Sequence, residues 1–289
     1  MRSAPQAVLH VRATGMSTTV QDEGRSGYAS WGVTRSGACD RAAYRLANRL
    51  VGNRAGAAGL EVLLGGLELA CDRPVTLAVT GAPCGGTPLD APFELLPGRV
   101  LRLGAPPVGL RSYVAVRGGI DVTPVLGSRA TDTLSGLGPP PLRPGDRLPV
   151  GGAVTAMPGV DVAPVHPPPG GPVTVRVTPG PRLDRFGDRA WATLLATERV
   201  VGTDSDRVGV RLTGPALDHR AGQDELPSEG VLRGAVQVPP SGTPVVFLAD
   251  HPVTGGYPVL AYLLDDDRRS DVDRLAQARP GQHVRFRPA

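Results

Sequence analysis

The residues whose types and spacing suggest chemistry lie in separate polar segments of the chain. In the C-terminal one, a strand-like run leads into Asp250 and His251, and a glycine turn follows at Gly255 and Gly256. An imidazole titrates near neutral pH, so His251 could act as a general base or proton shuttle, oriented by Asp250. The glycines would let the backbone approach a ligand closely. The alternative is a loop histidine that only bonds backbone groups.

The N-terminal polar segment, residues 18–28, is punctuated by glycines and contains Gln21 and Asp22. Asp22 is a candidate for proton transfer, and Gln21 is a candidate for binding a substrate through its side-chain amide. The alternative is that these two residues form an ordinary turn.

Residues 36–40 directly precede a predicted helix. Backbone amides at a helix N-terminus can hold an anion such as a carboxylate or phosphate, and Asp40 and Arg41 would lie in the first turn. The alternative is that Ser36 or Asp40 is an ordinary helix cap.

A further polar segment, residues 203–211, contains Ser205, Arg207 and Arg211. The arginines could make forked contacts to a carboxylate, bicarbonate or phosphate, although such a run is more often a turn with local salt bridges. The chain has no nucleophile elbow, no zinc-binding HExxH motif and no dinucleotide fingerprint. Spacing alone therefore gives no reaction class, and we expect no metal site.

Lysine is absent from the sequence, so all 31 basic Lys+Arg residues are arginines. This excludes a Schiff-base lysine, a P-loop lysine and a lysine that carries biotin or a lipoyl group. If the protein works with biotin, another chain must carry it.

The formal net charge is +4, but the arginines are scattered among acids, as in residues 265–271. Without a basic stripe interleaved with aromatic residues, we expect no nucleic-acid partner. Cys39, Cys71 and Cys84 are odd in number and lack metal-ligand spacing, which indicates reduced thiols. Residues 1–11 contain no apolar signal core, and no apolar run is long enough to span a membrane. We expect a cytoplasmic protein.

The elements that must position these segments are mainly strands. The 39 glycines and 31 prolines separate short apolar runs, which is typical of many turns and short strands. Strand-like runs occupy residues 8–11, 77–80, 100–103, 113–116, 173–177, 245–248 and 284–286. Helical spacing is found from Ala42 to Val51, in a second helix that Asp188 would cap, and over residues 271–278.

Residues 151–172 are rich in glycine and proline and are predicted to connect two modules, residues 1–150 and 173–289. A weak internal repeat supports this division. Residues 143–148 and 279–284 both begin with Arg-Pro-Gly, which suits a type II turn, and both continue as a strand. A similar Pro-Gly pair at residues 97–98 shows that such turns are common in this chain.

Taken together, the motifs resemble the biotin-dependent carboxyltransferase A/B-type family, which includes the 5-oxoprolinase C subunits, allophanate hydrolase subunit 2 and KipA-like proteins. The matching stretches are TTVQDEGRSGY (18–28), GVTRSGACDRAAYRLANRLVGN (32–53), LEVLLGG (60–66), VTGA (79–82), YVAVRGGIDVTPVLGSRATD (113–132), SDRVGVRL (205–212), SEGVLRGAVQVPPSGTPVVFLAD (228–250), TGGYP (254–258) and RLAQARPGQHVRF (274–286).

The resemblance implies a mainly β fold with a few helices, with a cyclophilin-like β-barrel architecture in two modules. It also implies a cyclophilin-like B-type subunit as partner and, with an A subunit, an ATP-dependent 5-oxoprolinase that opens 5-oxoproline to glutamate. This chain would be inactive without its partners. Two alternatives stay open: a subunit that moves a carboxyl group from carboxybiotin, carried on another chain, to urea or a similar small amide, and a regulatory partner without turnover.

Under the favoured hypothesis, the candidate catalytic residues are Asp250, His251, Asp22 and Arg207. The candidate substrate-binding residues are Gln21, Ser36, Asp40, Arg41, Ser205, Gln237, Thr254, Gly255, Gly256 and Tyr257.

Overall fold

The structure, a computed structural model, describes residues 6–221, 226–266 and 270–289. The chain forms two compact units: unit 1 comprises Met1–Arg25, Asp40–Asp132 and Gly136–Pro168, and unit 2 comprises Ser26–Cys39, Thr133–Ser135 and Pro169–Ala289. Two stretches from the predicted N-terminal module, residues 26–39 and 133–135, therefore pack with unit 2. Residues 1–5 of the N-terminal stretch and residues 267–269 of the acid–arginine run lie outside the described residues.

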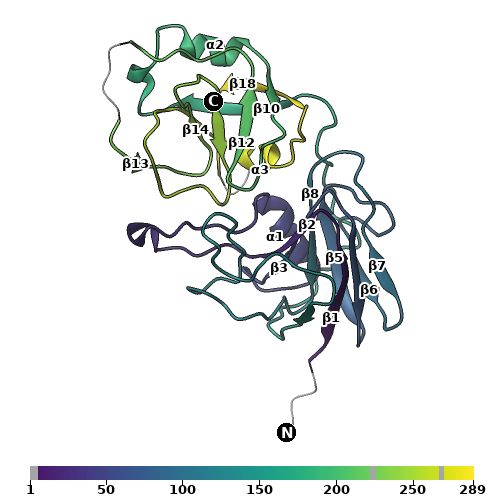
Figure 1. The fold of residues 1–289 in the computed structure, drawn as a ribbon. Coiled ribbons are helices and arrows are strands. Elements are labelled where there is room, and N and C mark those ends of the chain that lie inside the picture. The colour runs from purple at the N-terminus through teal and green to yellow at the C-terminus, as the bar shows by residue number, and fades with distance from the viewer. Residues whose placement is uncertain (1–5, 222–225, 267–269) are drawn as a thin grey trace. The chain divides into compact units, whose positions relative to one another are not determined.

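Unit 1 contains two antiparallel sheets (Figure 1). One has the order β7-β4-β1-β9 and the other the order β2-β3-β8-β5-β6. The bounds are β1 Val8–Thr14, β2 Ser17–Gln21, β3 Gly59–Leu63, β4 Leu67–Cys71, β5 Val75–Gly81, β6 Pro92–Leu95, β7 Val100–Arg102, β8 Arg111–Val116 and β9 Arg147–Pro149. Valines and leucines from both sheets form one core, because the alternation of side chains along each strand directs them to the same side.

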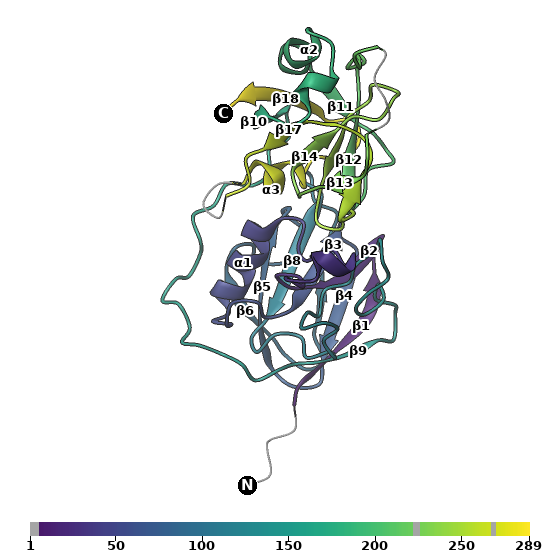
Figure 2. The same cartoon turned by 90° about the vertical axis from the view of Figure 1, so that its left-hand side faces the viewer.

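Helix α1 (Arg41–Leu50) confirms the predicted helical spacing and packs on β5 and β8 (Figure 2). Its buried face carries Tyr44 and Ala47, and the Asp40 carboxylate accepts a hydrogen bond from the amide of Ala43, at 2.9 Å. Asp40 is therefore the N-cap. Ser36 lies outside the helix, with a left-handed φ of 55°.

Unit 2 contains a closed barrel with the strand order β10-β17-β14-β15-β12-β11-β18. The bounds are β10 Val173–Pro179, β11 Arg199–Val201, β12 Gly209–Thr213, β14 Ala235–Gln237, β15 Val245–Phe247, β17 Val259–Leu263 and β18 His283–Pro288. The pairing is antiparallel except between β10 and β18. Outside the barrel, β13 (Glu229–Gly230) pairs with β16 (Thr254–Gly255). The prediction of a mainly β fold containing a β-barrel is confirmed.

The helices of unit 2 are short: η1 Ala29–Trp31, η2 Leu183–Arg185, α2 Ala190–Ala196 and α3 Asp271–Leu275. The prediction that Asp188 caps α2 is wrong, because the helix begins one residue later and the Asp188 carboxylate accepts from Arg220 instead, at 2.9 Å. The third helix is shorter than predicted. After Leu275 the hydrogen-bond spacing changes to that of a 3-10 turn, since the amide of Ala278 donates to the carbonyl of Leu275, three positions earlier.

The predicted Pro-Gly turns are present at all of their positions. Gly98, Gly145 and Gly281 each have positive φ, and the following residue donates its amide to the carbonyl three positions earlier. That is the geometry of a type II turn. Strands β7 and β9 of unit 1 and strand β18 of unit 2 follow these turns, so the same type of turn precedes strands in both units.

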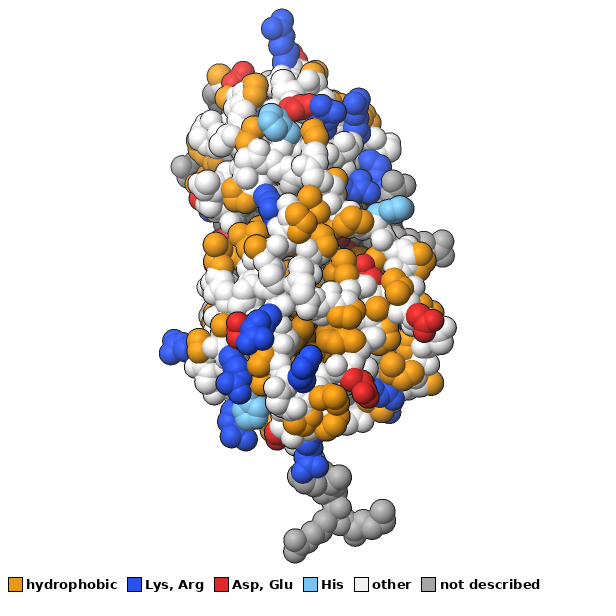
Figure 3. All heavy atoms as spheres, turned by 90° about the vertical axis from the view of Figure 1, so that its right-hand side faces the viewer, with side chains coloured by type: hydrophobic (Ala, Val, Ile, Leu, Met, Phe, Trp, Pro, Cys, Tyr) orange, Lys and Arg blue, Asp and Glu red, His pale blue; other side chains and the backbone are white. Residues whose placement is uncertain are grey.

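On the face of the molecule shown in Figure 3, arginines stand singly or in small groups among acidic and hydrophobic side chains. Cys39, Cys71 and Cys84 are buried, and none of the three forms a disulfide bond. Within the described ranges, none of the helices has the length and apolar character needed to cross a membrane.

Candidate functional site

Asp250 lies at the centre of a buried polar cluster in unit 2. The side chain is fully buried, and Oδ1 accepts a hydrogen bond from Ser36 Oγ at 2.6 Å. Oδ2 accepts from both the backbone amide and the hydroxyl of Thr133, at 2.9 and 2.7 Å. Asp250 thus connects two segments from earlier in the chain to the segment that follows the barrel strand β15.

Arg207 completes this cluster with a forked contact. Its Nε and Nη2 donate to the two carboxylate oxygens of Asp250 at 2.9 and 3.0 Å, and Nη2 also donates to the Gly37 carbonyl at 2.7 Å. Burial alone raises the pKa of Asp250, but the Arg207 guanidinium and the hydroxyl and amide donors outweigh it, so the pKa is lowered. Asp250 is a carboxylate at neutral pH, and it positions backbone segments through its hydrogen bonds.

His251 follows Asp250 in the chain and is half-buried. Its Nδ1 lies 2.7 Å from the carbonyl oxygen of Pro252, and its ring packs against Phe247. The hydrogen bonds of Asp250 go to Ser36, Thr133 and Arg207, so the predicted orienting bond between neighbours is replaced by a backbone contact.

Ser205 belongs to a local turn rather than to this cluster. Its hydroxyl oxygen accepts from the amide of Arg211 at 3.0 Å, and Arg211 forms an exposed ion pair with Asp204. Of the two arginines singled out in this segment, only Arg207 makes the forked contact, and it makes it to Asp250.

In unit 1, Asp22 is buried and joins two loops. Its Oδ1 accepts from Ser128 Oγ at 2.6 Å and from the Gly24 amide at 2.8 Å, and Oδ2 accepts from the amide of Arg129 at 2.6 Å. The Gln21 amide nitrogen donates to the Thr131 carbonyl at 3.0 Å. Arg41 opens helix α1 and is half-buried. These residues sit in unit 1, whereas the Asp250 cluster sits in unit 2.

The glycine turn, residues 255–257, begins in β16 and is held by Gln237. The Gln237 amide donates to the carbonyl oxygen of Tyr257 at 2.8 Å. Gly255 leaves the space for this contact, since a Cβ there would lie 2.5 Å from Gln237 Nε2. Thr254 and Gly255 pair with β13, so the turn is fixed on both sides.

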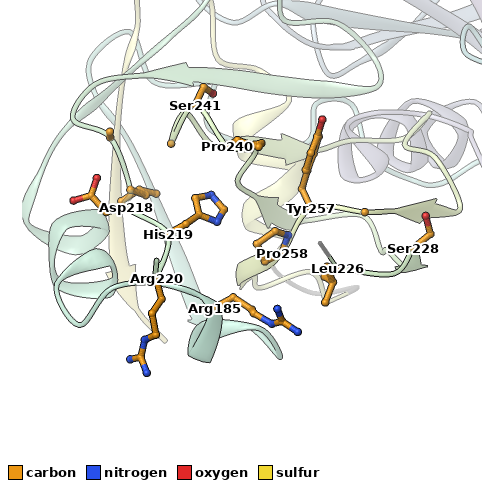
Figure 4. Close-up of a pocket in the computed structure, with 14 residues that line it drawn as sticks. Arg185, Asp218, His219, Arg220, Leu226, Ser228, Pro240, Ser241, Tyr257 and Pro258 are labelled. Atoms are coloured by element: carbon orange, nitrogen blue, oxygen red, sulfur yellow. The ribbon is translucent and has the colours of Figure 1, made fainter. Parts of the chain in front are cut away.

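This turn forms one wall of a pocket of about 1110 Å³ in unit 2 (Figure 4). The pocket is lined by Arg185, Ala216, Leu217, Asp218, His219, Arg220, Leu226, Ser228, Pro240, Ser241, Gly242, Gly256, Tyr257 and Pro258. Gly256 and Tyr257 were singled out from the sequence, and His219 was not. The sequence signal for His219 is weak, because its partners lie elsewhere in the chain.

A model of the family described as "Carboxyltransferase domain, subdomain A and B" matches residues 31–288. The chain is 38% identical to the 5-oxoprolinase C subunit of Escherichia coli (strain K12), over 96% of this chain and 90% of that protein. It is 31% identical to the protein of the same name from Haemophilus influenzae, over 93% and 87% of the two chains.

Solved structures agree. The crystal structure of TTHA0988 matches with a TM-score of 0.85 and 37% identity, over 99% of this chain and 57% of that chain. The K. lactis urea amidolyase matches with a TM-score of 0.87 and 28% identity, over 99% of this chain and 19% of that chain. This chain therefore spans little more than half of the first of these proteins and about a fifth of the second. The chain belongs to the carboxyltransferase family whose domain comprises subdomains A and B.

Proposed function

We propose that this chain is the C subunit of an ATP-dependent 5-oxoprolinase, which converts 5-oxoproline to glutamate together with A and B subunits. The observation that carries the proposal is the match to the 5-oxoprolinase C subunit of E. coli, 38% identical over 96% of this chain and 90% of that protein. The near-complete coverage of both chains supports a subunit of the same kind.

The chemistry of the chain is compatible with this assignment. Opening an unstrained lactam requires stabilisation of the charge that develops on its carbonyl oxygen, and arginines or backbone amides can supply it without a lysine. ATP would drive the reaction within the complex. We assign substrate contact in this chain to the pocket of unit 2, because the glycine turn forms one of its walls and Gln237 holds this turn through the Tyr257 carbonyl.

We assign Asp250 and Arg207 a positioning role in this function. Their buried pair forms hydrogen bonds to Ser36, Gly37 and Thr133. Asp250 also directly precedes residues 251–253, which lead to the glycine turn. His251 and Asp22 stay predicted proton carriers, and the predicted substrate contacts outside the pocket stay Ser36, Asp40, Arg41, Ser205 and Gln21.

A second candidate function is carboxyl transfer from carboxybiotin to a small amide. It is favoured by the 31% identity to the urea amidolyase of Lachancea kluyveri over 97% of this chain, although this match covers only 17% of that protein. Biotin would have to be carried on another chain, since lysine is absent here.

The test is glutamate release from 5-oxoproline and ATP by this chain co-purified with its B-type neighbour and supplied with the A subunit. We expect release that disappears when this chain is omitted and that avidin does not inhibit. A well-formed complex that releases no glutamate but carboxylates urea in an avidin-sensitive way would overturn the proposal in favour of the second candidate.

A further inference from the structure

His219 is held inside the pocket of unit 2 by backbone pairing. It forms an antiparallel bridge with Phe186, and the neighbouring residues extend this pairing through Gly187 N to Asp218 O and Arg220 N to Arg185 O, both at 2.9 Å. The imidazole stacks on the Phe186 ring, with centroids 5.0 Å apart and an interplanar angle of 38°. The half-buried ring thus has a defined position.

The contacts of the ring also define its tautomer. His219 Nε2 lies 3.0 Å from the carbonyl oxygen of Pro239. A carbonyl oxygen only accepts hydrogen bonds, so Nε2 must carry the hydrogen in this contact. In the neutral ring, the lone pair is then on Nδ1, which is the arrangement that a general base needs.

The pocket around His219 is lined by rings and by a few charged side chains. Figure 4 shows the rings of His219, Tyr257 and Pro258 around the same space, whereas Asp218 and Arg220 point away from it. Arg220 is paired with Asp188. The charged and titratable groups that line the pocket with His219 are Arg185, Asp218, Arg220 and Tyr257, and Asp184 belongs to the same 3-10 helix as Arg185.

We propose that His219 is a catalytic residue of this pocket, where its Nδ1 transfers the proton during opening of a small lactam. The proposal rests on the proposed function. A water oxygen bonds to the lactam carbonyl carbon while Nδ1 takes one water proton. The ring C–N bond then breaks, and the proton passes from Nδ1 to the leaving nitrogen. Lactam and one water molecule become the amino acid in this step, and a coupled phosphoryl transfer in the complex, which is not assigned to His219, converts ATP and a second water molecule to ADP and phosphate.

The experiment compares wild-type complex with complexes carrying His219→Gln or His283→Gln. Glutamine keeps a donor for the Pro239 carbonyl, so we expect the fold to be retained. Its side chain cannot transfer a proton. His283 is the matched control, since its half-exposed ring pairs with Glu198, which directly precedes β11. We expect His219→Gln to lower kcat about 10²–10⁴-fold with KM for 5-oxoproline changed less than about 3-fold. The acid limb of the wild-type pH–rate profile should vanish, and added imidazole should restore part of the rate. His283→Gln should keep wild-type kinetics.

Co-purification and thermal unfolding establish that each variant is folded. An active wild-type complex whose His219→Gln variant keeps the same kcat and acid limb would overturn the role of His219. Loss of activity with a raised KM and no rescue by imidazole would also overturn it, in favour of a purely binding role. A wild-type complex that releases no glutamate would instead contradict the proposed function. Binding of 5-oxoproline, measured by calorimetry, then tests the pocket assignment independently. Tight binding that Tyr257→Ala abolishes would support the pocket as the ligand site, whereas no binding would overturn the inference.

Discussion

At the scale of single residues, the buried carboxylate of Asp250 fixes the positions of the groups that donate hydrogen bonds to it. Its carboxylate accepts hydrogen bonds from Ser36, Thr133 and Arg207 and has no exposure to solvent. A carboxylate with a lowered pKa and this many donors is a poor proton acceptor, so its effect on activity should come through the segments that it holds.

Replacing Asp250 should therefore destabilise unit 2. Asp250→Asn leaves the Arg207 guanidinium buried without a counter-charge, and we expect the free energy of unfolding to fall by about 3–5 kcal/mol. Chemical denaturation at neutral pH measures this change. The matched control is Asp204→Asn, which breaks the exposed pair with Arg211 and should cost less than about 1 kcal/mol. Equal effects of the two substitutions would contradict the structural role of Asp250.

Asp90 in unit 1 gives a pH-dependent prediction. Burial raises its pKa from 3.8 to about 6, and its Oδ1 lacks a hydrogen-bond partner among the described residues. Because the folded state then binds the proton more tightly than the unfolded state, stability should fall as pH rises from about 4 to about 6 and level off above. Asparagine tolerates the left-handed φ of 55° at this position.

Asp90→Asn should remove this slope and raise the free energy of unfolding at pH 7 by about 1–3 kcal/mol. Denaturation curves between pH 4 and 7 test it, with the exposed Asp161→Asn as the control that should shift stability by less than about 0.5 kcal/mol. Parallel pH profiles for wild type and Asp90→Asn would refute the assignment of a buried titrating carboxyl.

At the scale of elements, the pocket wall depends on the pairing of β13 with β16 and on Gln237 behind it. Gly255 and Gly230 lie on these two paired strands, but a Cβ at Gly255 would meet Gln237 Nε2 at 2.5 Å, whereas a Cβ at Gly230 would meet nothing within 4 Å. The two glycines thus differ in what they make room for.

Gly255→Ala should displace the Gln237 side chain from the Tyr257 carbonyl and distort the turn. We expect kcat/KM of the assembled complex to fall at least about 10-fold, since small misplacements of a binding wall cost about this much or more. Gly230→Ala is the control and should keep activity within about 2-fold. Steady-state kinetics of both variants, with thermal unfolding to verify folding, distinguish the two. Normal kinetics for Gly255→Ala would show that the turn does not shape the site.

Local patterns predicted the elements better than the site. Helix α1 and the strands have apolar periodicity within a few neighbouring residues, which is why they were predictable. Asp250 bonds Ser36 and Thr133 across 214 and 117 positions of the chain, and no local pattern contains such pairs. His219 was missed for the same reason, because the Phe186 ring and the Pro239 carbonyl come from separate loops.

At the scale of the whole molecule, the two units have separate hydrophobic cores, yet unit 2 depends on early segments of the chain. Ser36 and Thr133 supply donors to Asp250, and Cys39 belongs to the core of unit 2. The family match from residue 31 to residue 288 includes residues of both units.

A fragment of residues 169–289 should therefore be less stable than unit 2 in the full chain. It lacks three hydrogen bonds to the Asp250 carboxylate, and we expect a loss of at least about 3 kcal/mol in the free energy of unfolding. Circular dichroism and denaturation of fragment and full chain measure it. A fragment that unfolds at the same denaturant concentration as the corresponding transition of the full chain would contradict the contribution of residues 26–39 and 133–135.

The central claim is that this chain is a required part of a lactam-opening complex. It is tested most directly by adding purified chain back to a mixture of the A and B subunits, with 5-oxoproline and ATP, and measuring glutamate as a function of the amount added. We predict negligible release without the chain, a rise that saturates as the complex fills, and no dependence on biotin. Full glutamate release from the A and B subunits alone, unchanged by the added chain, would contradict the account.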